Sequence, residues 1–132
     1  MSNLTSRNTV LSFFEAANQG DMETCTQLFS ENLVWTDIGT TRFAGRYEGK
    51  ANVLENLIGP LFSQLEAGIY STIKNVICEE DQVVVQSVGS AKTADGTPYE
   101  NDYCQIFTVK DGKIVEVVEY CDTALVNEVF GK

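Results

Sequence analysis

The chain has 132 residues, of which 43% are apolar, and a formal net charge of −10, so we expect one domain over residues 1–132 with a hydrophobic core. The charge argues against nucleic acid, whose binding requires Lys and Arg to neutralise phosphates, and against anionic membrane surfaces. The sequence has no histidine, which excludes Ser-His-Asp and Cys-His catalysis and the usual zinc sites, and leaves acid–base chemistry to Asp, Glu, Tyr or Lys.

The first part of the chain predicts two helices and a strand. Residues 5–19 repeat apolar side chains at helical spacing, and Gly20 follows as a C-terminal stop. Asp21 has the position of an N-cap for a second, shorter helix. Residues 32–38 alternate as a short strand. The alternation places on one face Leu33, Trp35 and Asp37.

The middle of the chain predicts a loop and a third helix. Residues 39–49 are rich in Gly, Thr and Arg and indicate the loop. Residues 50–66 repeat apolar side chains at helical spacing. Gly59-Pro60 lies inside this helix, and because proline cannot donate a backbone hydrogen bond, it predicts a kink or break.

From Gly68 onward the pattern is that of β-strands joined by hairpins. The expected strands are 69–78 and 82–93, followed by a turn at 94–96, a hairpin over 99–122 and a last helical turn within 123–132. Helices on one face of a curved, mainly antiparallel sheet make an α+β domain. The other face, with Val84, Ile106 and Val118 among its candidates, is expected to meet a second copy of the chain in a homodimer.

The hairpin over 99–122 turns at Asp111-Gly112, a strong hairpin signal. A two-residue turn would place Tyr103 beside Tyr120 and direct Glu119 to the opposite face. A three-residue loop with a bulge would place Tyr103 opposite Glu119. Because a slip of one residue reverses every side chain, the local sequence leaves both registers open.

The four cysteines are widely spaced and form no C-x-x-C pair. They are most simply reduced packing residues. The first ten residues lack the charged and apolar build of a signal peptide, and no apolar run is long enough for a membrane helix. We therefore expect a cytoplasmic protein.

Several strings, taken in order, resemble the nuclear transport factor 2-like superfamily, in particular its SnoaL-like and ketosteroid-isomerase-like branch. The strings are Phe13-Phe14 with Gly20-Asp21-Met22-Glu23, Leu33-Val34-Trp35 with Gly45-x-Tyr47-x-Gly49-Lys50, Phe107-Thr108-Val109-Lys110-Asp111-Gly112-Lys113-Ile114, and Glu119-Tyr120-Cys121-Asp122-Thr123. The resemblance implies a cystatin-like conical half-barrel with three N-terminal helices, one hydrophobic pocket and a dimer. It also favours the bulged register, with Tyr103 and Glu119 both facing the pocket.

Position by position, Asp37 resembles the carboxylate base of ketosteroid isomerases, which implies a proton shuttle. Tyr103 falls near the acid that binds the oxyanion in those enzymes, and a phenol can donate in the same way. The tyrosine of their first helix falls on Phe13, so a second donor is missing.

A likeness to limonene-type epoxide hydrolases is partial. Glu119 occupies the place of their essential aspartate on the last strand. Their arginine and second aspartate fall on Gln86 and Val88, so the epoxide-opening triad is incomplete, although both positions remain candidates for contact with a substrate.

Other candidate binding residues come from the pattern of the strands. Trp35 and Tyr47 are large aromatic residues that either pack in the core or line the mouth of the pocket. Asn101 and Gln105 are amides on a mostly apolar face and favour the binding of a ligand's polar group. Cys121 shares the face of Glu119.

Each carboxylate also has a structural interpretation. Asp37 can cap the Gly-Thr-Thr loop that follows its strand. Glu119 lies among valines, which makes a carboxylate costly unless it is used or satisfied. It can be a base, a ligand anchor, or a structural acid bonded to Tyr103 and Asn101.

Three functions remain open. The first is an enzyme that isomerises or cyclises a small hydrophobic molecule by proton transfer, with Asp37, Glu119 and Tyr103 as catalytic residues and no metal or redox cofactor. The second is a non-catalytic binding module that uses the same pocket. The third is a dimerisation domain, and an epoxide hydrolase without the full triad is a further alternative to the isomerase.

Overall fold

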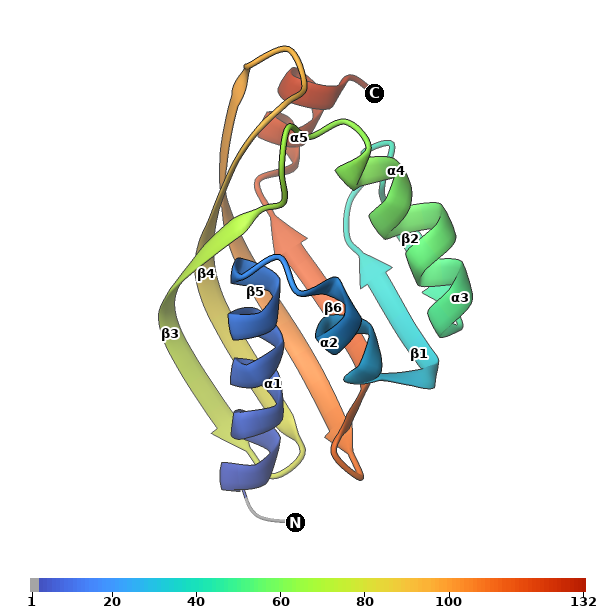
Figure 1. The fold of residues 1–132 in the computed structure, drawn as a ribbon, viewed down its shortest axis with the longest axis vertical. Coiled ribbons are helices and arrows are strands. Elements are labelled where there is room, and N and C mark those ends of the chain that lie inside the picture. Colours follow the sequence, from blue (N-terminus) through green and yellow to red (C-terminus); the bar gives the residue numbers. More distant parts are fainter. Residues whose placement is uncertain (1–2) are drawn as a thin grey trace.

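A curved sheet forms the frame of the fold, and the helices lie over one of its faces (Figure 1). The computed structural model describes residues 3–132. Within that range the sheet has six strands in the order β2-β1-β6-β5-β4-β3. Neighbouring strands are antiparallel except β1 and β6, which are parallel. The expected α+β architecture is confirmed.

The elements have the following bounds. The strands are β1 (Phe29–Asp37), β2 (Gly45–Glu48), β3 (Tyr70–Glu79), β4 (Gln82–Lys92), β5 (Pro98–Lys110) and β6 (Lys113–Cys121). The helices are α1 (Asn3–Asn18), α2 (Met22–Gln27), α3 (Lys50–Val53), the π-helix η1 (Leu54–Ile58), α4 (Gly59–Phe62) and α5 (Thr123–Phe130).

Helices α1 and α2 meet at the predicted break. Gly20 has a φ of +74°, in the left-handed region that glycine adopts most easily. The side chain of Asp21 then accepts from the backbone N–H of Thr24 at 3.1 Å and caps α2. Both predictions are confirmed. Helix α1 packs across β3, β4 and β5 and buries Val10 and Phe14 against them.

The third helix is divided more finely than the sequence predicts. In place of one kinked helix, α3 is followed by one stretch of π-helix and then by α4. The backbone N–H of Gly59 donates to the carbonyl of Leu54, five residues back. Pro60 has no N–H and its ring would crowd the carbonyl four residues back, so a widened turn just before it relieves the conflict.

Strand β2 lies in the segment that the sequence predicts to be loop. It pairs antiparallel with the end of β1, with Tyr47 opposite Trp35 and Gly45 opposite Asp37. Only Tyr47 among its four residues is partly buried. Because three of the four residues of β2 are exposed, its sequence shows no alternation of apolar and polar residues that could predict a strand.

The hairpin between β5 and β6 combines parts of both predicted registers. Asp111 and Gly112 have φ values of +52° and +74°, as a two-residue type I′ turn requires. The bulge is not at the turn but at Val115, where Thr108 pairs with Glu116 and Val109 with Ile114.

The bulge in β6 decides which way Glu119 faces. Beyond it, Glu119 is opposite Gln105 and Cys121 is opposite Tyr103. The expected pairing of Tyr103 with Glu119 is therefore wrong, because the partner of Tyr103 is Cys121, two residues further along β6. Glu119 still lies on the same face of the sheet as Tyr103. Its partner Gln105 is two residues from Tyr103 on β5, and residues two apart on a strand point to the same side. We call this face, which the helices cover, the inner face.

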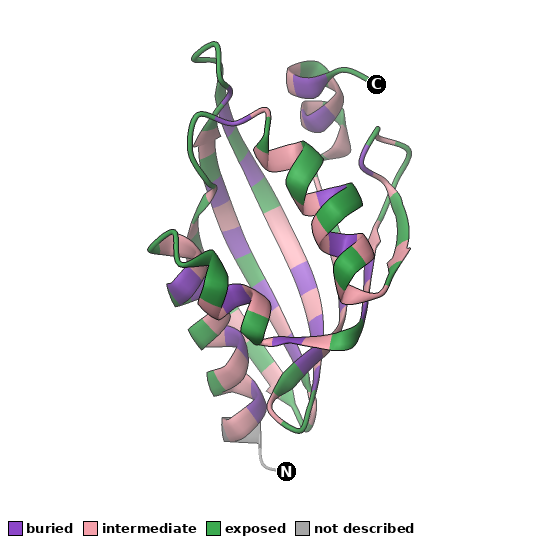
Figure 2. Ribbon diagram, turned by 45° about the vertical axis from the view of Figure 1, so that its right-hand side comes forward, coloured by how far each residue is buried: buried purple, intermediate pink, exposed green. Residues whose placement is uncertain are grey.

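Buried residues alternate with more exposed ones along the long strands (Figure 2). Within residues 3–132 the helices lie over the inner face of the sheet (Figure 1), and the outer face carries none. Ile77 and Tyr120 are 56% and 44% exposed there, and Val84, Ile106 and Val118 are partly buried. The homodimer through this face stays a prediction. No helix within residues 3–132 has the length and apolar character needed to cross a membrane.

Candidate functional site

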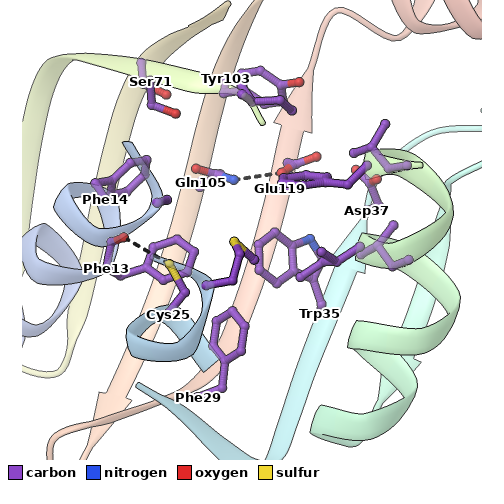
Figure 3. Close-up of a pocket in the computed structure, with 18 residues that line it drawn as sticks. Phe13, Phe14, Cys25, Phe29, Trp35, Asp37, Ser71, Tyr103, Gln105 and Glu119 are labelled. Carbon is purple, nitrogen blue, oxygen red and sulfur yellow. Dashed lines mark hydrogen bonds between the residues drawn. The ribbon is translucent and has the colours of Figure 1, made fainter. Parts of the chain in front are cut away.

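A cavity of about 130 Å³ lies between the inner face of the sheet and the helices. Its wall is mainly apolar: α1 and α2 contribute Phe13, Phe14 and Cys25, and the π-helix and α4 contribute Leu57 and Phe62. The polar lining residues come chiefly from the sheet (Figure 3). For comparison, an apolar cavity of about 150 Å³ in another protein holds one benzene molecule. The volume therefore matches a ligand of about one ring.

Two carboxyl groups face each other in the cavity wall. Asp37 ends β1, and Glu119 is its direct neighbour on the parallel strand β6. The backbone N–H of Ile38 donates to the carbonyl of Glu119 at 3.1 Å, which continues the ladder past the pair. Each of the two carboxyl groups affects the pKa of the other. Nε2 of Gln105 also donates to Oε1 of Glu119 at 2.7 Å.

Burial holds protons on this carboxyl pair. It raises the pKa of Asp37 from 3.8 to about 6. The pKa of Glu119 is raised well above its usual value, first by burial and then by the neighbouring Asp37 carboxylate. Among residues 3–132, no Lys or Arg that would oppose these shifts lines the cavity. Asp37 is therefore mostly ionised above about pH 6, and Glu119 keeps its proton to a higher pH than an exposed glutamate does.

Tyr103 lies beside the pair and belongs to a second set of hydrogen bonds. Its hydroxyl is 2.7 Å from that of Tyr99, and either can donate. Nδ2 of Asn101 donates to the Tyr99 hydroxyl at 2.9 Å and to the carbonyl of Asp122 at 3.1 Å. Burial raises the pKa of Tyr99 to about 12 and that of Tyr103 further. Both phenols are neutral, so Tyr103 can donate a hydrogen bond but does not act as a base.

Trp35 contributes a polar atom that has no partner. Its side chain is only 6% exposed and packs edge-on against Phe29, with the ring centroids 6.2 Å apart. The indole Nε1 is buried and has no hydrogen-bond partner among the described residues. Figure 3 shows this nitrogen on the side of the indole that faces Asp37 and Glu119.

Comparison with known proteins identifies the family. A family model described as the SnoaL-like domain matches residues 10–117. The chain belongs to the SnoaL-like domain family. A comparison with curated protein sequences gives no match.

Solved structures show the same fold as this SnoaL-like domain. Bal32a, from a soil-derived mobile gene cassette, is 25% identical over 96% of each chain with a TM-score of 0.84. A candidate isomerase from Bacillus subtilis is 24% identical over 100% of this chain and 98% of its own, with a TM-score of 0.81. A candidate SnoaL-like polyketide cyclase from Jannaschia sp. CCS1 is 17% identical over 97% and 92%, with a TM-score of 0.78.

The SnoaL-like fold brings six of the candidate residues together in the cavity wall. These are Phe13, Trp35, Asp37, Tyr103, Gln105 and Glu119. They come from α1, β1, β5 and β6, and only the tertiary structure makes them neighbours. Their chemical roles stay predictions.

Three of the other candidates lie on the inner side of the sheet but do not line the 130 Å³ cavity. Tyr47 donates its hydroxyl to the carbonyl of Phe43 at 2.8 Å. Asn101 is 2% exposed, and its side-chain amide hydrogen-bonds to Tyr99 and to the backbone of Asp122 instead of facing the cavity. Cys121 lines a smaller cavity of about 20 Å³ behind the carboxyl pair.

Gln86 and Val88 lie on the wrong side of the sheet for contact with the cavity. On β4 the buried positions are odd-numbered, and these two residues are on the outward face. Gln86 is exposed there and its Oε1 accepts from Nδ2 of Asn75 at 3.2 Å. The positions that matched the epoxide-hydrolase site therefore do not reach it.

Sequence reasoning missed much of the apolar wall. Lining residues that it did not select as site residues include Phe14, Cys25, Phe29, Leu57, Leu61, Phe62, Ser71 and Ser87. The apolar residues repeat at helical spacing, a signal that is the same for a packed core and for a cavity wall. The small polar residues Ser71 and Ser87 on β3 and β4 were the available hint.

Proposed function

We propose that this SnoaL-like domain binds a small, neutral, hydrophobic carbonyl compound and moves a proton on it without a cofactor, as an isomerase or a cyclase. The observation that carries the proposal is the carboxyl pair. Asp37 and Glu119 are direct neighbours across β1 and β6, and both pKa values are raised in an apolar cavity. Perturbed carboxyl groups in a concave site are typical of acid–base catalysis.

In the proposed reaction the two carboxyl groups have different roles. The Asp37 carboxylate takes a proton from the carbon next to the carbonyl, and the electron pair of that C–H bond moves onto the carbonyl oxygen. The protonated Glu119 stabilises the resulting enolate by donating a hydrogen bond. Isomerisation of a β,γ-unsaturated ketone is completed when Asp37 returns the proton to the γ-carbon of the dienolate, so that the C=C bond moves into conjugation with the re-formed carbonyl. Cyclisation is completed when the enolate carbon attacks a second carbonyl of the same molecule, whose oxygen takes the proton from Asp37.

The character of the wall supports a neutral ligand. The cavity already contains one ionised carboxylate, and the described part of the chain contributes no cationic side chain to its lining. A ligand with a carboxylate or phosphate would bring a second buried negative charge without compensation, which is costly. A ring of about six atoms with one carbonyl group fits both the charge and the volume.

The comparisons support the reaction class only in a general way. One similar structure is described as a candidate isomerase and another as a candidate polyketide cyclase. The epoxide-hydrolase alternative loses support, because Gln86 and Val88 are on the outward face of β4. A binding module without turnover is the alternative that an experiment must distinguish from an enzyme.

Exchange of the α-protons of cyclohexanone in D2O, followed by proton NMR, tests the proposal. We expect the wild-type protein to accelerate exchange and Asp37→Asn to lose at least a hundredfold of that acceleration, since a general base contributes about 10² to 10⁴. Glu119→Gln, which keeps a neutral donor, should retain part of it. Gln86→Ala, on the outer face, is the matched control. Binding of cyclohexanone without accelerated exchange would instead identify a binding module.

A further inference from the structure

The indole N–H of Trp35 is the least satisfied polar group in the wall of the cavity. It is buried in a residue that is 6% exposed and has no acceptor among residues 3–132. Buried polar groups almost always have a hydrogen-bond partner, and an unpaired one calls for an explanation. An indole nitrogen can only donate, so the group that satisfies it must bring an acceptor atom.

The described residues around Trp35 supply no acceptor for its indole N–H. The ring of Phe29 meets the indole edge-on and contributes only carbon and hydrogen atoms there. The Asp37 and Glu119 carboxyl groups lie on the same side as the nitrogen (Figure 3), but neither accepts from it. Oε1 of Glu119 instead accepts from Nε2 of Gln105 at 2.7 Å, and Asp37 is the direct neighbour of Glu119 on the parallel strand.

The position of Trp35 relates the unpaired donor to the carboxyl pair. Trp35 precedes Asp37 by two residues on β1, so both side chains project from the same face. Residues at this spacing are separated by about 6.6 Å along a strand. A carbonyl group and its α-carbon, which are next to each other in a small ring, can thus lie between an N–H and a carboxylate from one strand.

We propose that the indole N–H of Trp35 binds the carbonyl oxygen of the ligand and orients its α-carbon toward Asp37. The proposal rests on the proposed function for the nature of the ligand, a neutral ring ketone, and adds the group that selects it. In this proposal Trp35 supplies the hydrogen-bond donor that a phenylalanine at position 13 does not provide. The same ring without an oxygen acceptor would leave the indole unsatisfied and would bind less tightly.

The chain contains a single tryptophan, so its indole N–H gives one signal in a nitrogen-15 correlation spectrum. We would titrate the labelled protein with cyclohexanone and, in parallel, with methylenecyclohexane, which has the same shape but a CH2 group in place of the oxygen. Cyclohexanone is expected to move the indole proton downfield, as acceptance of a hydrogen bond does. Methylenecyclohexane is expected to shift the backbone signals around the cavity and not to move the indole proton downfield.

The variant Trp35→Phe removes the N–H and keeps an aromatic ring against Phe29. We expect it to bind cyclohexanone about tenfold more weakly, the loss typical of one hydrogen bond, and to bind methylenecyclohexane with little change. Equal indole shifts with the two probes, equal losses in the variant, or no binding of cyclohexanone would each overturn the proposal. If the variant does not fold, the wild-type titration decides alone.

This test is independent of turnover. A downfield shift with cyclohexanone but no α-proton exchange would support the role of Trp35 and contradict the proton-transfer function. Exchange that is accelerated while the indole signal stays in place would support the function and contradict the role of Trp35.

Discussion

Two groups of polar side chains lie on the inner side of the sheet and differ in how many of their hydrogen bonds the protein supplies. We call one the amide cluster, which consists of Tyr99, Asn101 and Asp122, and the other the carboxyl cluster, which consists of Asp37, Gln105 and Glu119. In the amide cluster Asn101 makes three hydrogen bonds, two as donor and one as acceptor. Two of these bonds join β5 to Asp122, whose side chain also caps α5.

The carboxyl cluster is satisfied only in part. Gln105 and Glu119 share one bond at 2.7 Å, and the two carboxyl groups are neighbours with raised pKa values. The unpaired N–H of Trp35 lies in the same wall. The difference teaches that a buried polar residue indicates structure where its bonds are complete and indicates ligand binding where they are not.

The largest effect should come from breaking the amide cluster. Asn101→Ala removes three hydrogen bonds and leaves the backbone N–H of Asp122 without its acceptor. We expect the free energy of unfolding to fall by about 3 to 4 kcal/mol, measured by urea denaturation. Gln105→Ala, which removes one bond to Glu119, should cost about 1 kcal/mol. Equal losses from the two substitutions would remove the distinction between the clusters.

The carboxyl cluster should instead reduce stability as the pH rises. The pKa of Asp37 is raised from 3.8 to about 6 in the folded protein, so the folded state keeps this proton longer than the unfolded chain. Its contribution to stability is therefore complete below about pH 4 and is lost as the pH rises to 6.

Asp37→Asn should remove this penalty. At pH 7 we expect the variant to be more stable than the wild type by about 2 to 3 kcal/mol, with little difference at pH 3.5. Thermal unfolding over that pH range provides the measurement. A variant less stable than the wild type at pH 7 would show that Asp37 is a structural cap of the loop that follows it.

The rate of α-proton exchange should report which carboxyl group is the base. With Asp37 titrating at about 6, the rate should increase about tenfold from pH 5 to pH 7, with the ionised fraction. The midpoint should persist in Glu119→Gln. Loss of all exchange in Glu119→Gln, with Asp37→Asn still active, would reverse the two roles.

The smallest effect is expected at Tyr103, which adjoins both clusters. Tyr103→Phe removes the hydroxyl that is 2.7 Å from Tyr99, but Tyr99 keeps its bond from Asn101. We expect a loss of less than about 1 kcal/mol in the free energy of unfolding. A loss as large as that of Asn101→Ala would place Tyr103 inside the amide cluster.

Much of the local structure could be predicted because it depends on near neighbours in the chain. Gly20 and Asp21 mark the junction of α1 and α2, and Asp111-Gly112 turns the hairpin, because each depends on backbone conformation within a few residues. The conflict at Pro60 was visible as well, although the π-helix that resolves it was not. The alternation along β1 also placed Trp35 and Asp37 on one face correctly.

Only the tertiary structure decided which polar residues work together. The bulge at Val115 sets the face and the cross-strand partner of Glu119. The local sequence does not distinguish registers that differ by one residue, although such a slip reverses every side chain. Asp37 and Glu119 are far apart in the chain and meet because β1 and β6 pair in parallel. Whether Asn101 or Trp35 finds a partner depends on atoms from several elements. Because these hydrogen-bond partners come from elements that are distant in the sequence, only the packed fold shows which polar groups are satisfied.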